Sequence, residues 1–346
     1  MVDKTDFSSA LEAQAENLRV SVDVVAAALA SADLAPWQPG ETVAVVAMGA
    51  STHSGEAFVA MLGTEGVRAM NVTASDLELA PPGFQPADHY VVVSESGRSP
   101  EPIRAAENFT PGRRIGITND PAAPLASAVD IVVPLGGWPD SRVYTTGFTA
   151  TLLAYAALIR YQRPSSTATD PATIPDVVAS AIDGLGEHAD RAAHLLEKVH
   201  AVDFVARGVS MAAATEGALV FREGARIHAA AYDTFQYIHG PMEPLGAGSA
   251  LVVFGDGREL PMLDMVLDRG VKVVLLTQAV QDVARPDHEN LVVVPVDRGV
   301  DGLARAVLET VFVQMLTVRH TQRAGIDINE FLFEQPDTKL DEATAQ

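Results

Sequence analysis

Residues 89–109 read "HYVVVSESGRSPEPIRAAENF". The apolar run at residues 89–93 predicts a buried strand, and the segment from Pro100 onward predicts a helix that begins at that proline. Between them stand three serines, a glycine and an arginine, which offer more hydrogen-bond donors than a plain turn needs. Donors at a strand-to-helix junction are typical of an anion site, because the N–H groups of a helix N-terminus are free. We therefore predict an anionic ligand at residues 94–99.

The same order of strand, polar turn and helix recurs along the chain. It is predicted from residue 41 to residue 66 and restarts near residue 202, after the Pro-, Ser- and Thr-rich residues 163–176. Buried strands that alternate with helices indicate a parallel sheet covered on both faces, so we predict two doubly wound α/β domains in tandem. The predicted parts are an N-terminal helix, a first domain, a linker, a second domain and a tail closing the active site, at residues 1–34, 35–162, 163–176, 177–326 and 327–346.

The composition argues against several kinds of site and partner. With 48% hydrophobic residues, the 346-residue chain can bury two cores, and the absence of cysteine excludes disulfides and zinc–thiolate sites. A formal net charge of −21 disfavours nucleic acid and anionic membranes as partners. The polar N-terminus and the lack of a long apolar run predict neither a signal peptide nor a membrane span, so a cytoplasmic location is expected. We expect no cofactor and no metal.

Four segments carry a resemblance to a known family. They are "MGASTHSG" at 48–55, "SESGRSPEP" at 94–102, "VYTTGFTATLLA" at 143–154, and residues 206–245, which hold E-G-A-L, a later Glu and H-G-P. In this order and spacing they resemble the tandem sugar-isomerase (SIS) domain proteins, especially the isomerase half of glucosamine-6-phosphate synthase. The resemblance implies two SIS domains, a homodimer, and a small anionic sugar as the substrate. The reaction it implies is aldose–ketose isomerisation, through a cis-enediol, of a hexose with an anionic group at its 6-position.

The resemblance also implies which residues bind the sugar. The substrate-binding candidates are Gly49, Ser51, Ser94, Glu95, Ser96, Arg98, Ser99, Arg142, Glu216 and Lys339. The simpler alternative for Ser94 and Ser99 is that they only cap the following helix. The synthase's tail lysine, which forms an imine with the ketose, aligns with Asp341 or Glu342 here, and Lys339 stands two or three residues earlier.

Glu95 departs from the family pattern, in which glutamine is usual at this position. A carboxylate beside a dianionic phosphate is unfavourable, and a singly charged group such as a sulfonate tolerates it better. Arg98 is the nearest cation in sequence to offset this charge. The alternative is a solvated Glu95 that points outward and pairs with Arg98.

The predicted catalytic residues are Glu223 and His239. Aldose–ketose conversion needs a base that moves a proton between C1 and C2, and a group that opens the sugar ring. By resemblance Glu223, in a helix predicted over residues 214–232, moves the proton, and Glu216 two helical turns earlier supports the site. His239 is suited to ring opening, and in the family this histidine reaches the neighbouring subunit's active site.

Two other functions remain open from the sequence. A deaminase acting on an amino-sugar phosphate, or a deglycase acting on a fructosyl-amino-acid phosphate, would use the same residues. Val220 replaces a lysine of the synthase, which weakens both readings slightly. A noncatalytic sugar-phosphate sensor is the alternative of another class, but such proteins usually carry a basic DNA-binding segment, and none is visible here.

Overall fold

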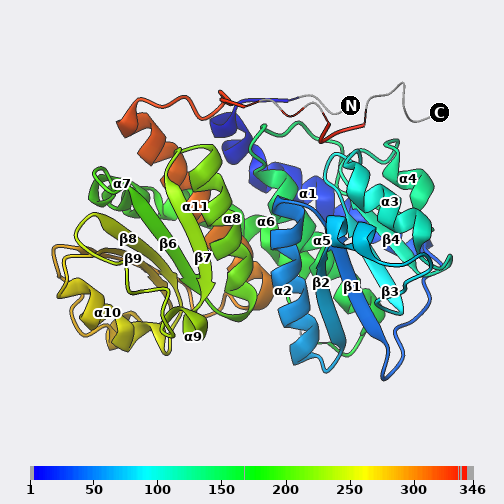
Figure 1. The fold of residues 1–346 in the computed structure, drawn as a ribbon, viewed down its shortest axis with the longest axis horizontal. Coiled ribbons are helices and arrows are strands. Elements are labelled where there is room, and N and C mark those ends of the chain that lie inside the picture. The colour runs from blue at the N-terminus through cyan, green and yellow to red at the C-terminus, as the bar shows by residue number, and fades with distance from the viewer. Residues whose placement is uncertain (1–3, 167, 334, 336, 341–346) are drawn as a thin grey trace. The chain divides into compact units, whose positions relative to one another are not determined.

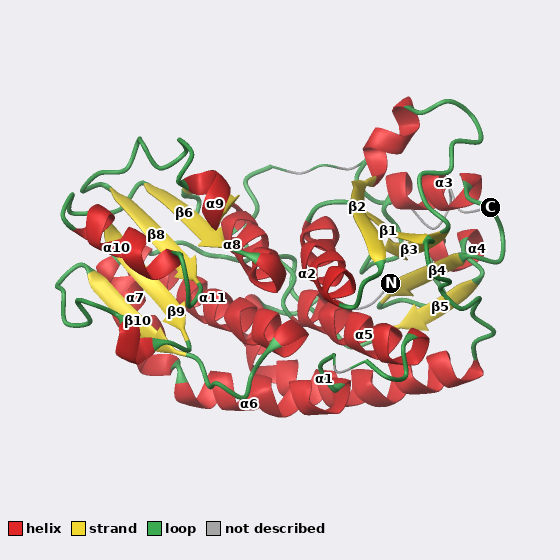
Figure 2. Cartoon of the chain, turned by 90° about the horizontal axis from the view of Figure 1, so that it is seen from below, coloured by secondary structure: helices red, strands yellow, loops and turns green. Residues whose placement is uncertain are grey.

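The computed structural model describes residues 4–166, 168–333, 335 and 337–340. The chain divides into two compact units, Met1–Pro175 with Leu332–Gln346, and Asp176–Phe331. Each unit holds one five-stranded parallel sheet with helices on both of its faces (Figures 1 and 2). The predicted fold class, two doubly wound parallel sheets, is confirmed.

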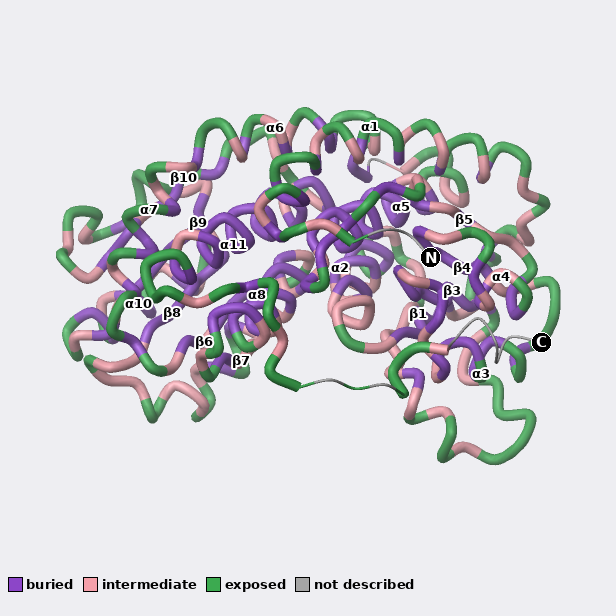
Figure 3. Tube along the Cα trace, turned by 90° about the horizontal axis from the view of Figure 1, so that it is seen from above, coloured by how far each residue is buried: buried purple, intermediate pink, exposed green. Residues whose placement is uncertain are grey.

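The first sheet has the strand order β2-β1-β3-β4-β5. Its strands are Thr42–Ala47 (β1), Arg68–Thr73 (β2), His89–Val93 (β3), Arg114–Thr118 (β4) and Ile131–Pro134 (β5). The apolar runs of β1 and β3 are buried because helices cover both faces (Figure 3). Ala47 pairs with Val93 at the carboxyl ends of these two strands, so the loops that follow them begin side by side.

Helices cover the two faces of the first sheet as separate groups. One face contacts the long helices Phe7–Ser31 (α1) and Ala50–Thr64 (α2), and Thr146–Gln162 (α5) packs on both of these helices. The other face contacts the shorter elements Pro100–Asn108 (α3), Leu125–Ala128 (α4) and Ala74–Leu79 (η1), and a further turn, Pro171–Thr173 (η2), packs on α5. Tyr90 and Phe109 stack with ring centroids 3.7 Å apart in the core beneath α3. The apolar faces of the helices thus enclose the sheet on both sides.

The second sheet has the order β10-β9-β8-β6-β7, which repeats the order of the first when its strands are counted from β6. Its strands are Ala201–Ala206 (β6), His228–Asp233 (β7), Ser249–Phe254 (β8), Lys272–Thr277 (β9) and Leu291–Pro295 (β10). Its helical elements are Ile174–Gly184 (α6), Gly186–Leu195 (α7), Gly208–Ser210 (η3), Met211–Glu223 (α8), Thr234–Tyr237 (α9), Glu259–Leu267 (α10), Val280–Asp282 (η4) and Gly302–Ala324 (α11). None of the helices within the described ranges has the length and apolarity that crossing a bilayer requires.

The helix predicted over residues 214–232 is wrong at its C-terminal end. Helix α8 ends at Glu223, and residues 228–233 form the edge strand β7. Arg226 has a φ of 58°, in the left-handed region, which no α-helix continues through. The alanines that suggested a helix pair with β6 instead, because packing against a neighbouring strand overrides their propensity.

Candidate active site

The loop after β3 gathers its hydroxyls at one point. The Ser94 Oγ lies 3.3 Å from the Ser99 Oγ and accepts from the Ser99 N–H at 3.4 Å, and the Arg98 N–H donates to the Ser96 Oγ at 3.3 Å. Ser99 precedes α3, but no described backbone N–H donates to its hydroxyl as a helix cap. Ser99 therefore does not cap α3 through its side chain, and its hydroxyl lies beside that of Ser94 instead.

Gly97 makes the tight loop possible. Its φ is +63°, and its N–H donates to the Ser94 carbonyl at 2.9 Å. A Cβ at this position would lie 2.5 Å from the Ala123 Cβ and 2.8 Å from the Thr118 Oγ1. Only glycine fits both the conformation and the space.

Lys339, from the C-terminal segment, lies against this loop. Its Nζ donates to the Ser96 Oγ at 3.0 Å and to the Ser99 Oγ at 3.2 Å, and the Leu340 N–H donates to the Arg98 carbonyl at 2.9 Å. The residue as a whole is exposed, yet its ammonium is turned into the loop. Desolvation there lowers the pKa of Lys339, and the charge of Glu95 opposes that shift. Asp341 and Glu342, the other tail positions considered above, lie outside the described residues.

Glu95 points into the protein. It is 7% exposed, its Oε1 accepts from the Asn119 Nδ2 at 3.1 Å, and its carbonyl accepts from the Asn119 N–H at 2.8 Å. Arg98 is also buried and forms an ion pair with Asp120 at 3.6 Å. The alternative of a solvated Glu95 is therefore wrong. The carboxylate belongs to the interior of the loop region, where its charge matters more than at the surface.

Two further residues beside Glu95 escaped the sequence analysis. Tyr144 lines one small pocket together with Glu95, and desolvation followed by the Glu95 charge raises the pKa of Tyr144 well above its ordinary value. Asp140 is 1% exposed, and desolvation followed by the Glu95 charge raises its pKa to about 6. Its carboxylate accepts from the N–H groups of Ser141 and Gly147 at 2.8 and 2.7 Å. An Asp shortly before a helix signals such a cap, but nothing in the sequence marks Tyr144.

The first loop joins the same region. Gly49, with a φ of +54°, leads into α2, and Ser51 lies in the first turn of that helix. A small pocket is lined by Ala50, Ser51, Ser54, Glu95, Tyr144, Gly147, Phe148 and Thr151. The structure thus brings Ser51 and Glu95 to one pocket, whereas Arg142 is exposed in the segment before α5.

The predicted catalytic residues lie in the second unit. Glu216, in α8, is 1% exposed, and Glu223 is the half-buried last residue of the same helix. His239 is exposed in the loop after α9, where Gly240 has a φ of +138°. Because Glu216 is buried, it is not an ordinary surface glutamate. The His239 imidazole is exposed and can be approached from outside the unit.

The turn after β8 matches the serine loop in position but not in chemistry. It reads "FGDGRELP", so Asp256 and Glu259 stand where the first unit has Ser96 and Ser99 relative to the loop glycine. Asp256 accepts from the Gln278 N–H at 2.6 Å and pairs with Arg305. Glu259, 5% exposed, accepts from the Gly257 N–H at 3.1 Å and lies 2.5 Å from the Thr234 Oγ1. The two carboxylates in this turn thus take their hydrogen bonds and ion pairs from the second unit itself.

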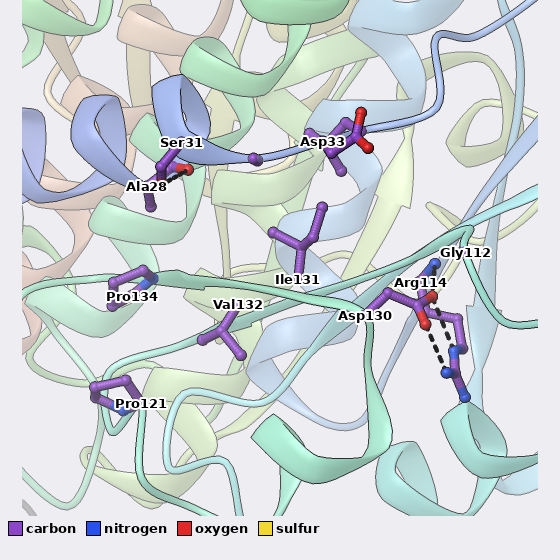
Figure 4. A pocket seen from close by; sticks show the side chains of 12 residues that line it. Ala28, Ser31, Asp33, Gly112, Arg114, Pro121, Asp130, Ile131, Val132 and Pro134 are labelled. Carbon is purple, nitrogen blue, oxygen red and sulfur yellow. Dashed lines mark hydrogen bonds and ion pairs between the residues drawn. The ribbon is translucent and has the colours of Figure 1, made fainter.

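A larger hollow of about 520 Å³ lies elsewhere in the first unit (Figure 4). Residues from the end of α1 and from β4 and β5 line it, and no candidate site residue is among them. Arg114, which lines this hollow, forms an ion pair with Asp130 at 2.7 Å. Within the described ranges, no three His, Asp or Glu side chains are grouped as a metal would require.

Comparison with known proteins supports the sugar-isomerase type of fold. Residues 195–319, within the second unit, match the SIS domain family. The chain is 26% identical over 259 residues to the glutamine–fructose-6-phosphate aminotransferase (isomerizing) of Sulfolobus acidocaldarius, and the match covers 72% of this chain. It spans only 42% of that relative's length.

Solved structures match nearly the whole chain. The C-terminal domain of the Francisella tularensis glucosamine-fructose-6-phosphate aminotransferase superposes with a TM-score of 0.79 at 20% identity, covering 94% of this chain and 97% of that domain. The Thermotoga maritima glucosamine-6-phosphate deaminase gives 0.76 at 18% identity, covering 96% and 98%. The Escherichia coli tagatose-6-phosphate ketose/aldose isomerase gives 0.72 at 18% identity, covering 96% and 97%. At these identities the likeness shows a shared fold.

Proposed function

We propose that this chain is an aldose–ketose isomerase of the SIS type, acting on a hexose with an anionic group at its 6-position. The observation that carries the proposal is the convergence of Lys339, Ser96 and Ser99, which places an ammonium and two hydroxyls at one loop. Such a set suits a phosphate or sulfonate. Ser94 and Ser51 complete the proposed anion site.

Proton transfer is assigned to residues of the second unit. Glu223 moves the proton between C1 and C2 of a cis-enediol, and Glu216 supports it from the same helix. His239 opens the sugar ring and acts in the site of a partner subunit in a homodimer. The exposure of His239 and the isomerising activities in the names of the similar proteins support this assignment.

The charge of Glu95 affects which anionic group the site would bind. The buried carboxylate lies near the donors that would meet the ligand, so a second negative charge on the ligand is repelled more strongly than a single one. This favours a singly charged group, such as the sulfonate of a 6-sulfohexose, over a dianionic phosphate. The second candidate function is an amino-sugar phosphate deaminase or fructosyl-amino-acid phosphate deglycase, which the likeness to the Thermotoga maritima deaminase favours.

A substrate screen tests the proposal. Hexose 6-phosphates, a 6-sulfohexose, amino-sugar phosphates and fructosyl-amino-acid phosphates are each incubated with the chain in D₂O and followed by NMR. We expect aldose–ketose conversion with deuterium entering at the carbon that exchanges its proton, and we expect Glu223→Gln to slow it on the order of 100-fold or more. Release of ammonia or an amino acid would favour the second candidate. Binding of sugars without any conversion by the wild-type chain would leave a noncatalytic sensor.

A further inference from the structure

Asn119, the first residue after β4, makes four hydrogen bonds that join the loops at the carboxyl ends of three strands. Its N–H donates to the Glu95 carbonyl at 2.8 Å, and its Nδ2 donates to the Glu95 Oε1 at 3.1 Å. The same Nδ2 donates to the Trp138 carbonyl at 2.9 Å, and the Asn119 Oδ1 accepts from the Gly137 N–H at 2.8 Å. Asn119 is fully buried. Its carboxamide has a single orientation, because exchanging its oxygen and nitrogen would set donor against donor and acceptor against acceptor.

The Glu95 side chain is also confined by the first turn of α5. A Cβ at Gly147 would lie 2.7 Å from the Glu95 Cγ, so the glutamate packs directly against the helix backbone and only glycine leaves room for it. Both residues line the small pocket that also contains Ser51. Asn119 and Gly147 together therefore fix where the Glu95 carboxylate lies.

The donors of the proposed anion site stand next to this carboxylate. Glu95 lies between Ser94 and Ser96 in the chain, and the Lys339 Nζ donates to the hydroxyl oxygens of Ser96 and Ser99 at 3.0 and 3.2 Å. A carboxylate is itself an anion that hydroxyls and an ammonium bind well, because hydrogen bonds between such groups are charge-assisted. A Glu95 side chain without its restraints would therefore compete with the ligand for these donors.

The second repeat offers a comparison within the same chain. Asp256 is an acid of the turn after β8, and the carboxamide directly after β9 is that of Gln278. The Gln278 Nε2 donates to two backbone carbonyls at 2.8 and 2.7 Å, and Asp256 forms an ion pair with Arg305. The cation of that turn is thus bound by the chain's own carboxylate. In the first repeat the Asn119 carboxamide binds the acid, and the ammonium of Lys339 lies on serine hydroxyls.

We propose that Asn119 is a positioning residue of the anion site, which keeps the Glu95 carboxylate from binding the serine hydroxyls and the Lys339 ammonium, so that these donors remain available to a ligand's anionic group. This inference rests on the proposed function, because it takes the serine loop as the site of the sugar's anion. The effect of Asn119 on ligand affinity then acts through Glu95. Removing the carboxamide should weaken binding where residue 95 is an acid and have little effect where it is neutral.

The test measures the binding of glucose 6-phosphate and of its 6-sulfonate analogue, 6-deoxy-6-sulfoglucose, by calorimetry at pH 8. Wild type, Asn119→Ala, Glu95→Gln and the double variant are compared. We expect Asn119→Ala to weaken the binding of each sugar that wild type binds by about fivefold or more, because the freed carboxylate takes charge-assisted hydrogen bonds that the ligand would make. In the Glu95→Gln background the same change should alter the Kd by less than about twofold.

Gln278→Ala is the matched control. It removes the carboxamide at the corresponding place in the second repeat, directly after β9, and should bind the sugars as wild type does. Three results overturn the inference. They are an unchanged affinity in Asn119→Ala, an equal loss of affinity with and without Glu95, which would leave Asn119 a structural role only, and an equal loss in Gln278→Ala.

If Asn119→Ala does not fold, Asn119→Asp replaces it, because this change keeps an acceptor for the Gly137 N–H and removes the donor to Glu95. Its weak binding should recover when Glu95→Gln is added, since the glutamine amide then donates in the reverse direction. No recovery also overturns the inference. If neither sugar binds wild type, both the inference and the proposed anion site fail. If sugars bind without conversion, only the proposed reaction fails.

Discussion

The ammonium of Lys339 lies 3.0 Å from the hydroxyl oxygen of Ser96, although 243 positions of sequence separate the two residues. The C-terminal segment thereby adds a positive charge to a loop whose own cation, Arg98, forms an ion pair with Asp120. In a chain with a formal net charge of −21, a local cation of this kind is what an anion site requires.

Lys339→Gln should weaken binding of an anionic sugar about tenfold or more, because charge-assisted hydrogen bonds to the anion are lost. The Michaelis constant should rise far more than turnover falls, since this contact is equal in ground and transition states. Calorimetric titration with the sugar identified by the screen measures the effect. Lys198→Gln, at an exposed lysine of the second unit, is the control and should bind normally. Equal binding by Lys339→Gln and wild type would exclude Lys339 from the site.

Gly97→Ala should destabilise the first unit by about 1–3 kcal/mol. Alanine is strained at the positive φ of this position, and its Cβ would clash with the Ala123 side chain. Both tryptophans, Trp37 and Trp138, are buried in this unit, so their fluorescence during urea unfolding follows it selectively. Gly63→Ala is the matched control within α2, where a Cβ meets nothing within 4 Å. It should stabilise by about 0.5–1 kcal/mol. The same change in stability for both variants would contradict the loop geometry.

The Asp140 carboxyl should make the first unit less stable as pH rises from about 4 to about 6. Its pKa is about 6 in the folded chain against an ordinary 3.8, so in this window the folded state keeps a proton that the unfolded state releases. The expected loss is about 3 kcal/mol at most, complete above the folded pKa. Tryptophan-detected urea unfolding at a series of pH values measures it. Glu95→Gln should shrink the loss by removing a neighbouring charge, whereas Glu12→Gln, in α1, should leave it intact. A stability that is flat or rises across this window would refute the expectation.

Glu223→Gln should cost on the order of 100-fold or more in turnover while sugar binding stays within about twofold of wild type, because the amide keeps the side chain's size but cannot accept the proton. Deuterium exchange at the reacting carbon, measured by NMR, reports the proton transfer directly. Glu243→Gln, at an acidic residue in the loop after His239, is the control and should retain wild-type turnover. Full exchange in Glu223→Gln would assign the base to another residue.

His239→Ala should slow conversion of the cyclic sugar but spare exchange on the small open-chain fraction. Mixing it with Glu223→Gln under conditions of subunit exchange tests the proposed sharing between subunits. A heterodimer would hold one site with both residues intact, so activity should return to at most about half of wild type within the heterodimer fraction. If heterodimers form and no activity returns, the histidine acts within its own chain or not at all.

Local patterns in the sequence predicted the fold class and the strand, turn and helix that form the serine loop. The run from His89 to Pro100 shows its strand, its turn and its helix start within twelve positions, so no tertiary information was needed. Strand β7 was missed because alanine favours helices, and only pairing with β6 makes residues 228–233 a strand. Resemblance placed Lys339 and Ser96 among the substrate-binding candidates, but the direct contact between them, like the position of Tyr144 near Glu95, depends on how distant segments fold onto each other.

Asp256 and Glu259, the acidic residues in the turn after β8, indicate that the two repeats differ in the substitutions they tolerate. Asp256 and Glu259 are accommodated because other groups of the second unit donate to them, the Gln278 N–H to Asp256 and the Gly257 N–H to Glu259, so this repeat keeps its fold with carboxylates at the positions equivalent to Ser96 and Ser99. In the first repeat the same change, serine to acid, would put a negative charge beside Glu95, in the proposed anion site. A saturation library scored for folding and for sugar binding would therefore separate the repeats: acidic variants at 96 and 99 would fold yet lose the ligand, whereas serine variants at 256 and 259 would keep the ligand and lose stability.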